Sequence, residues 1–342
     1  MTIIYFILVL SVTIFVHELG HFIFAKKAGI YVYEFCIGMG PRIFKFKRKN
    51  DETEYGIRLF PIGGFCSMAG ESVEIDEKVP ENRRMQSKTW LQRFLTVIAG
   101  VMFNFIFAII ILFIVGLVSG KPNSKNLVSE VLVDSPAYLS GLQKADIITS
   151  LNGVKVNNID GLMIEYQVNY GEVLKLEVER NGKKYDINIT PKIIDESYQY
   201  GFSLDNSIEK GFIAAVKYAF YKFFSLINQM IVIIGYLFTG KLSLSSLSGP
   251  IGIYNIVDQS AKAGLINVIY LIGYLSINVG FINLLPVPAF DGGRILFLII
   301  EKLRRKPIKP SVENTIHSVG LVLLMILMVA ITYNDILRFI IK

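Results

Sequence analysis

The chain has 342 residues, of which 52% are hydrophobic and only 18% are charged. A soluble domain typically has about 25% charged residues, and a disordered chain has low hydrophobicity, so both classes are excluded. The formal net charge of +7 does not indicate a nucleic-acid partner, because membrane proteins gather Lys and Arg in their cytoplasmic loops. The composition predicts a membrane protein with a polar insert.

The first predicted span covers residues 2–25, which exceeds the roughly 20 apolar residues that a hydrocarbon core requires. A cleavable signal peptide is the competing interpretation, but it fits poorly. No Lys or Arg precedes the stretch, and His17, Glu18 and His21 interrupt it.

A polar loop and a second span follow. Residues 26–93 contain 13 basic and nine acidic side chains, so the loop is positively charged. Within it, residues 54–67 have short β-type runs broken by Pro and Gly, which predict strands or a hairpin. Residues 94–118 are apolar and predict a second membrane-spanning helix.

Residues 127–191 have the pattern of a small soluble α+β domain. Apolar runs alternate with polar residues, and Asn-Gly pairs at 152–153 and 181–182 predict hairpin turns. The surrounding segment 120–210 has 10 basic and 13 acidic residues, the opposite sign to the first loop. This asymmetry predicts that 26–93 lies inside the cell and 120–210 outside.

The remaining apolar segments complete a four-span prediction. Residues 207–240 carry lysines at helical spacing, which predicts an amphipathic helix at the membrane surface, with a third span over 223–240 as the alternative. Spans are predicted at 264–285 and 316–333, with a basic loop at 294–309 between them. Both basic loops can lie inside only if an even number of crossings separates them, which favours four spans with both termini outside.

His17, Glu18 and His21 form an HExxH pattern inside the first span. On a helix, positions i and i+4 share one face, so both imidazoles can reach one metal ion. Glu18 stands at the edge of that face, where it can accept a proton from metal-bound water. A carboxylate inside a span costs about 2.5–3.5 kcal/mol or more, which favours a functional role over a structural polar contact.

Catalytic zinc usually has three protein ligands, so a third must come from elsewhere. Asp291 is the better candidate, because it follows two prolines and precedes two glycines. Irregular backbone at such a helix break can direct a carboxylate inward. A helix-ending turn at the membrane surface is the alternative. His317 is a second candidate, with an interfacial polar residue as the alternative. Cys36 and Cys66 could bind a soft metal or remain packed free thiols, with no disulfide scaffold.

Two sequence motifs, one near each end of the chain, resemble those of a known family. HELGH at 17–21 and NLLPVPAFDGG at 283–293 together resemble the site-2 protease family of intramembrane zinc metalloproteases, in its bacterial RseP/RasP branch. The order of segments, including SGPIGI at 248–253, agrees over nearly the whole chain. The stretch 131–156 resembles a PDZ domain of bacterial proteases, although Ala145-Asp146 replaces the usual Gly-Asp.

The resemblance implies a polytopic α-helical membrane protein with about four transmembrane helices, a membrane-associated β-hairpin loop and one inserted PDZ-like α+β domain. It implies that His17, His21 and Asp291 bind Zn²⁺ and that Glu18 is the general base. It also implies that Asn283 binds substrate and that residues 55–71 form the hairpin loop that presents substrate as an extended strand. The expected substrate-binding residues are therefore Asn283, Gly63, Gly64 and Phe65.

Four parts are expected along the chain. They are an N-terminal membrane part at 1–119, an extracytoplasmic PDZ-like domain at 120–206, an interfacial helix with the SGPIGI segment at 207–262, and a C-terminal membrane part at 263–342.

The expected function is cleavage of transmembrane segments of single-span membrane proteins, such as anti-sigma factors or signal-peptide remnants. The expected location is the bacterial inner membrane, with the active site toward the cytoplasm. The lipid bilayer and single-span substrates are the expected partners, and nucleic acid is not. A membrane metal transporter and a non-catalytic PDZ scaffold are the alternatives, against which an intact HExxH argues.

Overall fold

The computed structural model describes residues 1–71 and 78–339, and the chain divides into two compact units. Unit 1 comprises residues 1–115 and 244–342, and unit 2 comprises residues 116–243. Residues 72–77 of the predicted basic loop, and 340–342 at the end of the predicted C-terminal part, lie outside the described residues.

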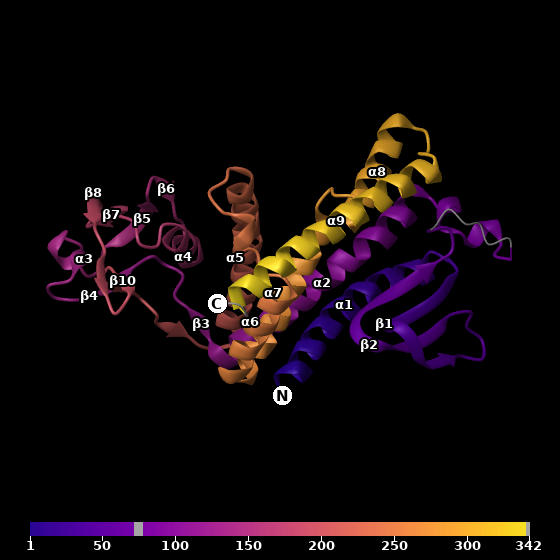
Figure 1. Cartoon of the computed structure of the whole chain (residues 1–342), viewed down its shortest axis with the longest axis horizontal. Helices are drawn as coiled ribbons and strands as arrows, with labels where there is room; N and C mark the ends of the chain where they lie inside the picture. Colours follow the sequence, from indigo (N-terminus) through magenta and orange to yellow (C-terminus); the bar gives the residue numbers. More distant parts are fainter. Residues whose placement is uncertain (72–77, 340–342) are drawn as a thin grey trace. The chain divides into compact units, whose positions relative to one another are not determined.

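Unit 1 consists of long apolar helices with a twisted pair of strands beside them (Figure 1). Its elements are α1 (Thr2–Lys27), β1 (Val32–Lys47), β2 (Glu54–Met68), the short 3-10 turns η1 (Glu81–Arg83) and η2 (Met85–Ser87), α2 (Trp90–Ser119), η3 (Leu244–Ser246), α6 (Pro250–Lys262), α7 (Leu265–Leu284), α8 (Asp291–Arg304) and α9 (Pro310–Phe339).

Helices α1 and α7 run in the same direction, and α2 runs against them. The starts of α1 and α7 share a buried cluster that includes Val9 and Val268. Along α2 the order is reversed, because Gly273 of α7 faces Ile111 whereas Gly280, later on α7, faces the earlier residue Phe105. The ends of α1 and α7 therefore lie together with the start of α2.

The opposite end of unit 1 is closed by α6 and the end of α9. Asp335 of α9 is only 2% exposed, and its carboxylate accepts a hydrogen bond from the backbone N–H of Gly252 at 2.8 Å. A Cβ on Gly249 would lie 3.0 Å from an Asp335 oxygen. The SGPIGI segment is thus a helix start whose free N–H is capped by a carboxylate from another helix, and its glycines leave room for that carboxylate.

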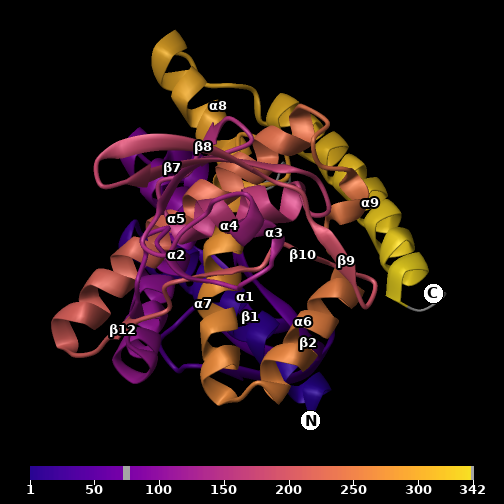
Figure 2. The same ribbon diagram turned by 90° about the vertical axis from the view of Figure 1, so that its left-hand side faces the viewer.

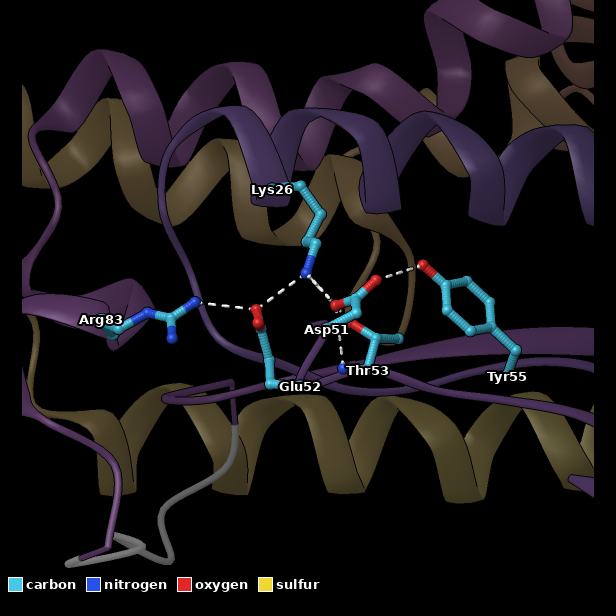
Figure 3. Close-up of polar contacts among 6 residues, drawn as sticks. All are labelled: Lys26, Asp51, Glu52, Thr53, Tyr55 and Arg83. Atoms are coloured by element: carbon cyan, nitrogen blue, oxygen red, sulfur yellow. Dashed lines mark hydrogen bonds and ion pairs between the residues drawn. The ribbon is translucent and has the colours of Figure 1, made fainter. Parts of the chain in front are cut away.

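The sheet of unit 1 is tied to the end of α1 by a polar cluster (Figure 3). The Lys26 amine lies 2.7 Å from Asp51 and 2.8 Å from Glu52, and Arg83 contacts the same Glu52 oxygen at 2.8 Å. The Tyr55 hydroxyl donates to Asp51 at 2.8 Å. Burial alone would raise the pKa of Asp51, but hydrogen bonds from Lys26, a backbone N–H and Tyr55 outweigh it and lower that pKa.

The prediction of strands or a hairpin over 54–67 is confirmed as a strand, β2, which finds its partner outside that range. Residues of β2 instead pair with β1, so that Phe46 lies opposite Tyr55, and Cys36 lies opposite both Phe65 and Gly56. Each long strand therefore bends, and together they make one compact sheet. Gly38 and Gly40 of the partner strand have positive φ values and mark its bend.

Five helices of the described residues are long and apolar enough to cross a membrane, namely α1, α2, α5 (Phe212–Phe238), α7 and α9. Four of them coincide with the predicted spans. The fifth, α5, covers the segment predicted to lie at the membrane surface, and its mean hydropathy of 1.4 is the lowest of the five. By length and composition alone there is thus one more candidate span than the predicted four.

Unit 2 is a small α+β assembly followed by the long helix α5. Its strands include a four-stranded antiparallel sheet in the order β6-β5-β7-β8, in which β7 and β8 are the longest members (Figure 2). Both predicted Asn-Gly turns are confirmed, with positive φ values at Asn152, Gly153, Asn181 and Gly182. The elements are β3 (Lys121–Pro122), β4 (Val128–Val131), α3 (Pro136–Leu139), β5 (Ile147–Leu151), β6 (Val154–Lys155), α4 (Ile159–Val168), β7 (Leu174–Arg180), β8 (Lys183–Ile189), β9 (Lys192–Ile194), β10 (Ser197–Gln199), β11 (Phe202–Leu204), β12 (Ile208–Glu209) and α5.

Candidate metal centre

Helix α1 brings its two histidines together on one face. His17 and His21 are one turn apart, and each is only 7% exposed. Their Nε2 atoms lie 3.2 Å from one another. The i, i+4 spacing thus gives two adjacent imidazole nitrogens in a buried setting, as the sequence predicts.

Asp291 adds a carboxylate to the pair from the other end of the sequence. It is the first residue of α8, after the break that follows α7. Its Oδ2 lies 3.1 Å from Nε2 of His17 and 3.3 Å from Nε2 of His21. One ligand atom from each of the three residues lies within 4.8 Å of the others, so these residues form a group that could hold a metal ion.

The geometry of this group fits zinc. In a tetrahedral site with Zn–N distances of about 2.0–2.1 Å, neighbouring ligand atoms lie about 3.3–3.4 Å apart. The three observed separations are 3.2, 3.1 and 3.3 Å. Within the described part of the chain, no donor makes a hydrogen bond of acceptable geometry to the buried Oδ2 of Asp291. The oxygen is therefore available to a cation.

Helix α2 supplies the partners that orient both imidazoles. Nδ1 of His21 lies 2.8 Å from the backbone oxygen of Thr96, and Nδ1 of His17 lies 3.4 Å from the amide nitrogen of Asn104. Asn104 is fully buried, and its Oδ1 has no partner among the described residues. Exchanging the amide nitrogen and oxygen would let Oδ1 accept from Nδ1–H of His17, which matches the usual outer partner of a metal-binding histidine.

Three residues of α2 that touch the imidazoles, namely Thr96, Gly100 and Asn104, are absent from the residues that the sequence motifs predict. A polar amide in the middle of an apolar span is a detectable signal, and Asn104 has that pattern. Gly100 has no such signal. A Cβ on it would lie 2.4 Å from Nε2 of His21 and 2.7 Å from Cε1 of His17, so only glycine leaves room for the imidazoles.

A cavity of about 400 Å³ opens from the metal-binding group. Glu18 lines it next to the histidines, as the HExxH spacing predicts, and Asn283 lines it from the end of α7. His317, the other candidate for the third ligand, is outside the metal-binding group but also lines this cavity. Arg294 is a further lining residue, and its guanidinium contacts Glu71 at 2.5 Å.

The three candidate residues on β2 have different environments. Gly64 is closest to the site, because a Cβ on it would lie 3.6 Å from Cγ of Glu18. Gly63 packs against the side chain of Met39. The Phe65 ring lies under the guanidinium of Arg58, 4.4 Å from ring centroid to Cζ. Among the described lining residues of the cavity, β2 is represented by Cys66 and Met68, not by Gly63 or Phe65.

The two cysteines are buried free thiols, and neither belongs to the metal-binding group. Burial, together with a hydrogen bond to Glu34, raises the pKa of Cys36 to about 11. Burial also raises the pKa of Cys66. A thiolate is the form that binds metal, so these shifts favour the packed-thiol interpretation over soft-metal ligation.

Comparisons with known proteins agree with the metal-binding geometry. The family model of peptidase family M50 matches residues 5–327. The zinc metalloprotease RasP of Shouchella clausii is 34% identical, with 98% of each chain covered. The regulator of sigma-W protease RasP of Bacillus subtilis is 32% identical, also with 98% of each covered. A Clostridium perfringens protein with a provisional zinc-metalloprotease name is 36% identical over 98% of this chain and 99% of that one.

The alignments differ in length. Those with the Shouchella and Bacillus proteins extend over 417 positions, whereas the alignment with the Clostridium protein extends over 340. This chain has 342 residues. The two longer relatives therefore contain insertions that this chain does not share.

Proposed function

This chain belongs to peptidase family M50 and is a multi-pass membrane zinc metalloprotease, and from that premise we propose that it cleaves the membrane-spanning segments of single-span membrane proteins. One observation carries the proposal: the HExxH residues lie in α1, a helix long and apolar enough to cross a membrane, with Asp291 beside them. A protease whose metal ligands lie in a membrane-spanning helix can reach peptide bonds within the bilayer, which soluble proteases cannot reach.

We assign zinc to His17, His21 and Asp291. Zinc held there would supply a Lewis acid for the scissile carbonyl and would lower the pKa of a nearby water toward about 7. Residues of the chain transfer the proton and hold the ligands in position. Glu18 accepts the proton of the attacking water and later delivers it to the leaving nitrogen. Thr96 and Asn104 hold the two imidazoles in orientation from α2.

Substrate must be unwound before it is cut, because the carbonyls of a helix are already hydrogen-bonded. The final residues of β2 fit the task of holding an extended segment. Gly64 is next to Glu18, and Cys66 and Met68 line the cavity. Added as a strand along β2, a substrate would place its backbone beside the metal-binding group, with Asn283 as a partner for a peptide group.

The charge pattern supports a location in the bacterial cell membrane with the metal centre toward the cytoplasm. Both basic loops, 26–93 and 294–309, adjoin the end of unit 1 that carries the metal-binding group. An engineered cysteine at Asn157 in unit 2 is then extracytoplasmic. It should react with an impermeant maleimide in intact cells, and reaction only after lysis would contradict this orientation.

Helix α5 is best explained as lying at the outer surface rather than crossing. The chain leaves unit 1 after Val115 and returns at η3, which contacts α9. Gly249, just after η3, faces Ile331 and Asp335 near the end of α9 that is remote from the metal-binding group. A chain that leaves and returns on one side crosses an even number of times. In unit 2, α5 also makes polar contacts with α4, where Lys222 and Ser225 contact Asp160 at 2.7 and 2.6 Å. These contacts favour four spans.

A groove in unit 2 favours its assignment as a PDZ-like domain that selects substrates. A cavity of about 720 Å³ lies between helix α4, which contributes Leu162 and Tyr166, and strand β11, which contributes Phe202 and Leu204. A helix facing a strand across a groove is the arrangement in which PDZ domains add a peptide strand. Deletion of 127–191 should let untrimmed single-span proteins be cut while trimmed ones are still cleaved. Loss of cleavage of the trimmed form would instead identify a required docking site.

The Bacillus subtilis relative is named a regulator of sigma-W protease, so membrane-bound anti-sigma factors are the first substrates to test, followed by signal-peptide remnants. The purified enzyme should cut such a single-span protein within its membrane segment. Glu18→Gln should retain zinc and fold while losing nearly all cleavage. Full activity of Glu18→Gln, or cleavage only outside the membrane segment, would overturn the proposal.

A further inference from the structure

His317 occupies an unusual position in the cavity of the metal centre. It belongs to α9, and it lines the cavity together with Glu18 and Asp291. Its Nδ1 receives a hydrogen bond from the backbone N–H of Ala289 at 3.0 Å. A backbone N–H can only donate, so Nδ1 must carry a lone pair, and the ring proton must then be on Nε2.

The Nε2–H of His317 is a buried donor without a partner in the described part of the chain. The carboxylate of Glu313, one turn earlier on α9, is 4.0 Å away, which is beyond hydrogen-bond distance. Buried polar groups are nearly always paired, so an unpaired donor at the wall of a cavity indicates an acceptor that arrives with a ligand. In a peptidase the acceptor that arrives is a peptide oxygen.

We propose that His317 is a catalytic residue whose Nε2–H donates a hydrogen bond to the scissile carbonyl oxygen as that oxygen gains negative charge. This role rests on the proposed function above. Water adds to the carbonyl carbon, the carbonyl π pair moves to the oxygen, and Glu18 takes the water proton. The carbonyl then re-forms, the C–N bond breaks, and the proton passes to the leaving nitrogen. His317 exchanges no proton and stabilises the charged oxygen.

Arg294 is the other strong donor at the cavity wall, but its guanidinium is engaged by Glu71 at 2.5 Å. The neutral imidazole of His317 is different. The hydrogen bond from Ala289 to Nδ1 fixes the orientation of the ring. The Nε2–H can therefore donate to the carbonyl oxygen without reorganisation when that oxygen gains charge.

The two nitrogens of His317 can be tested separately. In His317→Asn, Oδ1 takes the place of Nδ1 and can still accept from Ala289, but the donor at the Nε2 position is removed. In His317→Gln, the amide nitrogen reaches the Nε2 position and restores a donor. Thr315→Ala is the matched control, because Thr315 is exposed on α9 and bonds only the Ser311 carbonyl among the described residues.

Four measurements are made on the full chain in detergent or nanodiscs. They are bound zinc, kcat, KM, and the affinity for a phosphinic peptide, whose tetrahedral phosphorus mimics the hydrated scissile carbon. We expect His317→Asn to retain one zinc and a KM within about twofold of wild type. Its kcat should fall about 10²- to 10³-fold, and its phosphinic-peptide affinity should fall by a similar factor. His317→Gln should recover part of both losses.

Several results would overturn the assignment. The first is a His317→Asn enzyme with normal kcat and normal phosphinic-peptide affinity. The second is a His317→Asn enzyme that loses zinc in parallel with its rate. The third is an equal loss of kcat in Glu313→Gln, which would show that His317 acts through Glu313. Phosphinic-peptide binding needs the metal centre but no membrane substrate. If the wild type binds that inhibitor and yet cuts no membrane segment, the proposed function fails while the role of His317 is still measured.

Discussion

Gly100→Ala is the sharpest test of how the metal-binding group is built. The new methyl carbon would lie 2.4 Å from Nε2 of His21 and 2.7 Å from Cε1 of His17. Non-bonded heavy atoms prefer separations of about 3.5–4.0 Å, so the His21 ring must move by about 1 Å. Helices α1 and α2 already meet backbone to backbone, since a Cβ on Gly20 would lie 2.4 Å from the Ala99 carbonyl oxygen. The imidazoles therefore have little room to move away from α2.

A shift of that size is decisive for a metal site. Metal–ligand distances in real sites stay within about 0.2 Å of their ideal values, so a displacement of about 1 Å removes His21 as a ligand. Loss of outer-shell partners alone weakens metal binding about 10- to 100-fold, and loss of a ligand should exceed that. We therefore expect zinc affinity to fall at least about 100-fold. Alanine is a better helix former than glycine by about 0.8–1 kcal/mol, so α2 itself is not weakened.

The assay is zinc content after dialysis against a graded chelator, with helicity measured in parallel by circular dichroism. Gly235→Ala is the matched control, because it is also a glycine within a long helix but has open space where the methyl would go. The control should bind zinc like the wild type. If Gly100→Ala also binds zinc like the wild type while remaining folded, the close approach of α2 to the imidazoles does not limit the site, and the reasoning is refuted.

Three further outcomes are expected. Asn104→Ala should weaken zinc binding about 10- to 100-fold without unfolding, read by chelator competition, because His17 loses its outer partner; unchanged affinity would exclude that role. Asp335→Ala should lower the free energy of unfolding by about 1–3 kcal/mol in denaturant titration, because the buried N–H of Gly252 loses its acceptor, whereas an effect near zero would mean that water replaces it. Alkylation of Cys36 in the folded protein should rise about tenfold per pH unit from pH 7 toward its pKa of about 11, since the thiol form dominates below that pKa; a half-maximal rate near pH 8.5 would indicate an ordinary, unshifted thiol.

The sequence predicts those parts of the site that depend on local spacing. HExxH on an apolar helix fixes both imidazoles on one face, and the break before Asp291 marks a carboxylate that can turn inward. The contribution of α2 was not predictable in the same way. Which of its faces meets α1 depends on tertiary packing, and the packing is set by Gly20 and Gly100, whose importance is the absence of a side chain.

The β sheet and α5 show the same limit. Pro and Gly in 54–67 indicate a chain reversal, yet the strand bends and pairs with 32–47, because pairing partners are selected by contacts that a local pattern does not contain. For α5, hydropathy and length admit a span. Its contacts with Asp160, and the side on which the chain re-enters unit 1, favour the surface position instead.

The break between α7 and α8 can be explained by its hydrogen-bond donors. A backbone N–H without a partner is unfavourable at membrane depth, and six residues separate the two helices. Pro286 and Pro288 have no N–H to satisfy. Three of the other four N–H groups bond to nearby carbonyls, with Leu285, Val287 and Phe290 donating at 3.1, 2.7 and 3.2 Å.

The fourth donor is Ala289, which has a φ of +82° and bonds to the His317 ring rather than to a carbonyl. Gly292 and Gly293 then let α8 start against the carbonyls of Leu284 and Val287, where a Cβ would lie 2.4 and 2.6 Å from those oxygens. The prolines have no backbone N–H, and the glycines have no side chain that would collide with the neighbouring carbonyls. The His317 imidazole accepts the hydrogen bond of the one N–H that remains among these six residues. A single arrangement thus delivers the Asp291 carboxylate to the histidines and fixes the tautomer of His317.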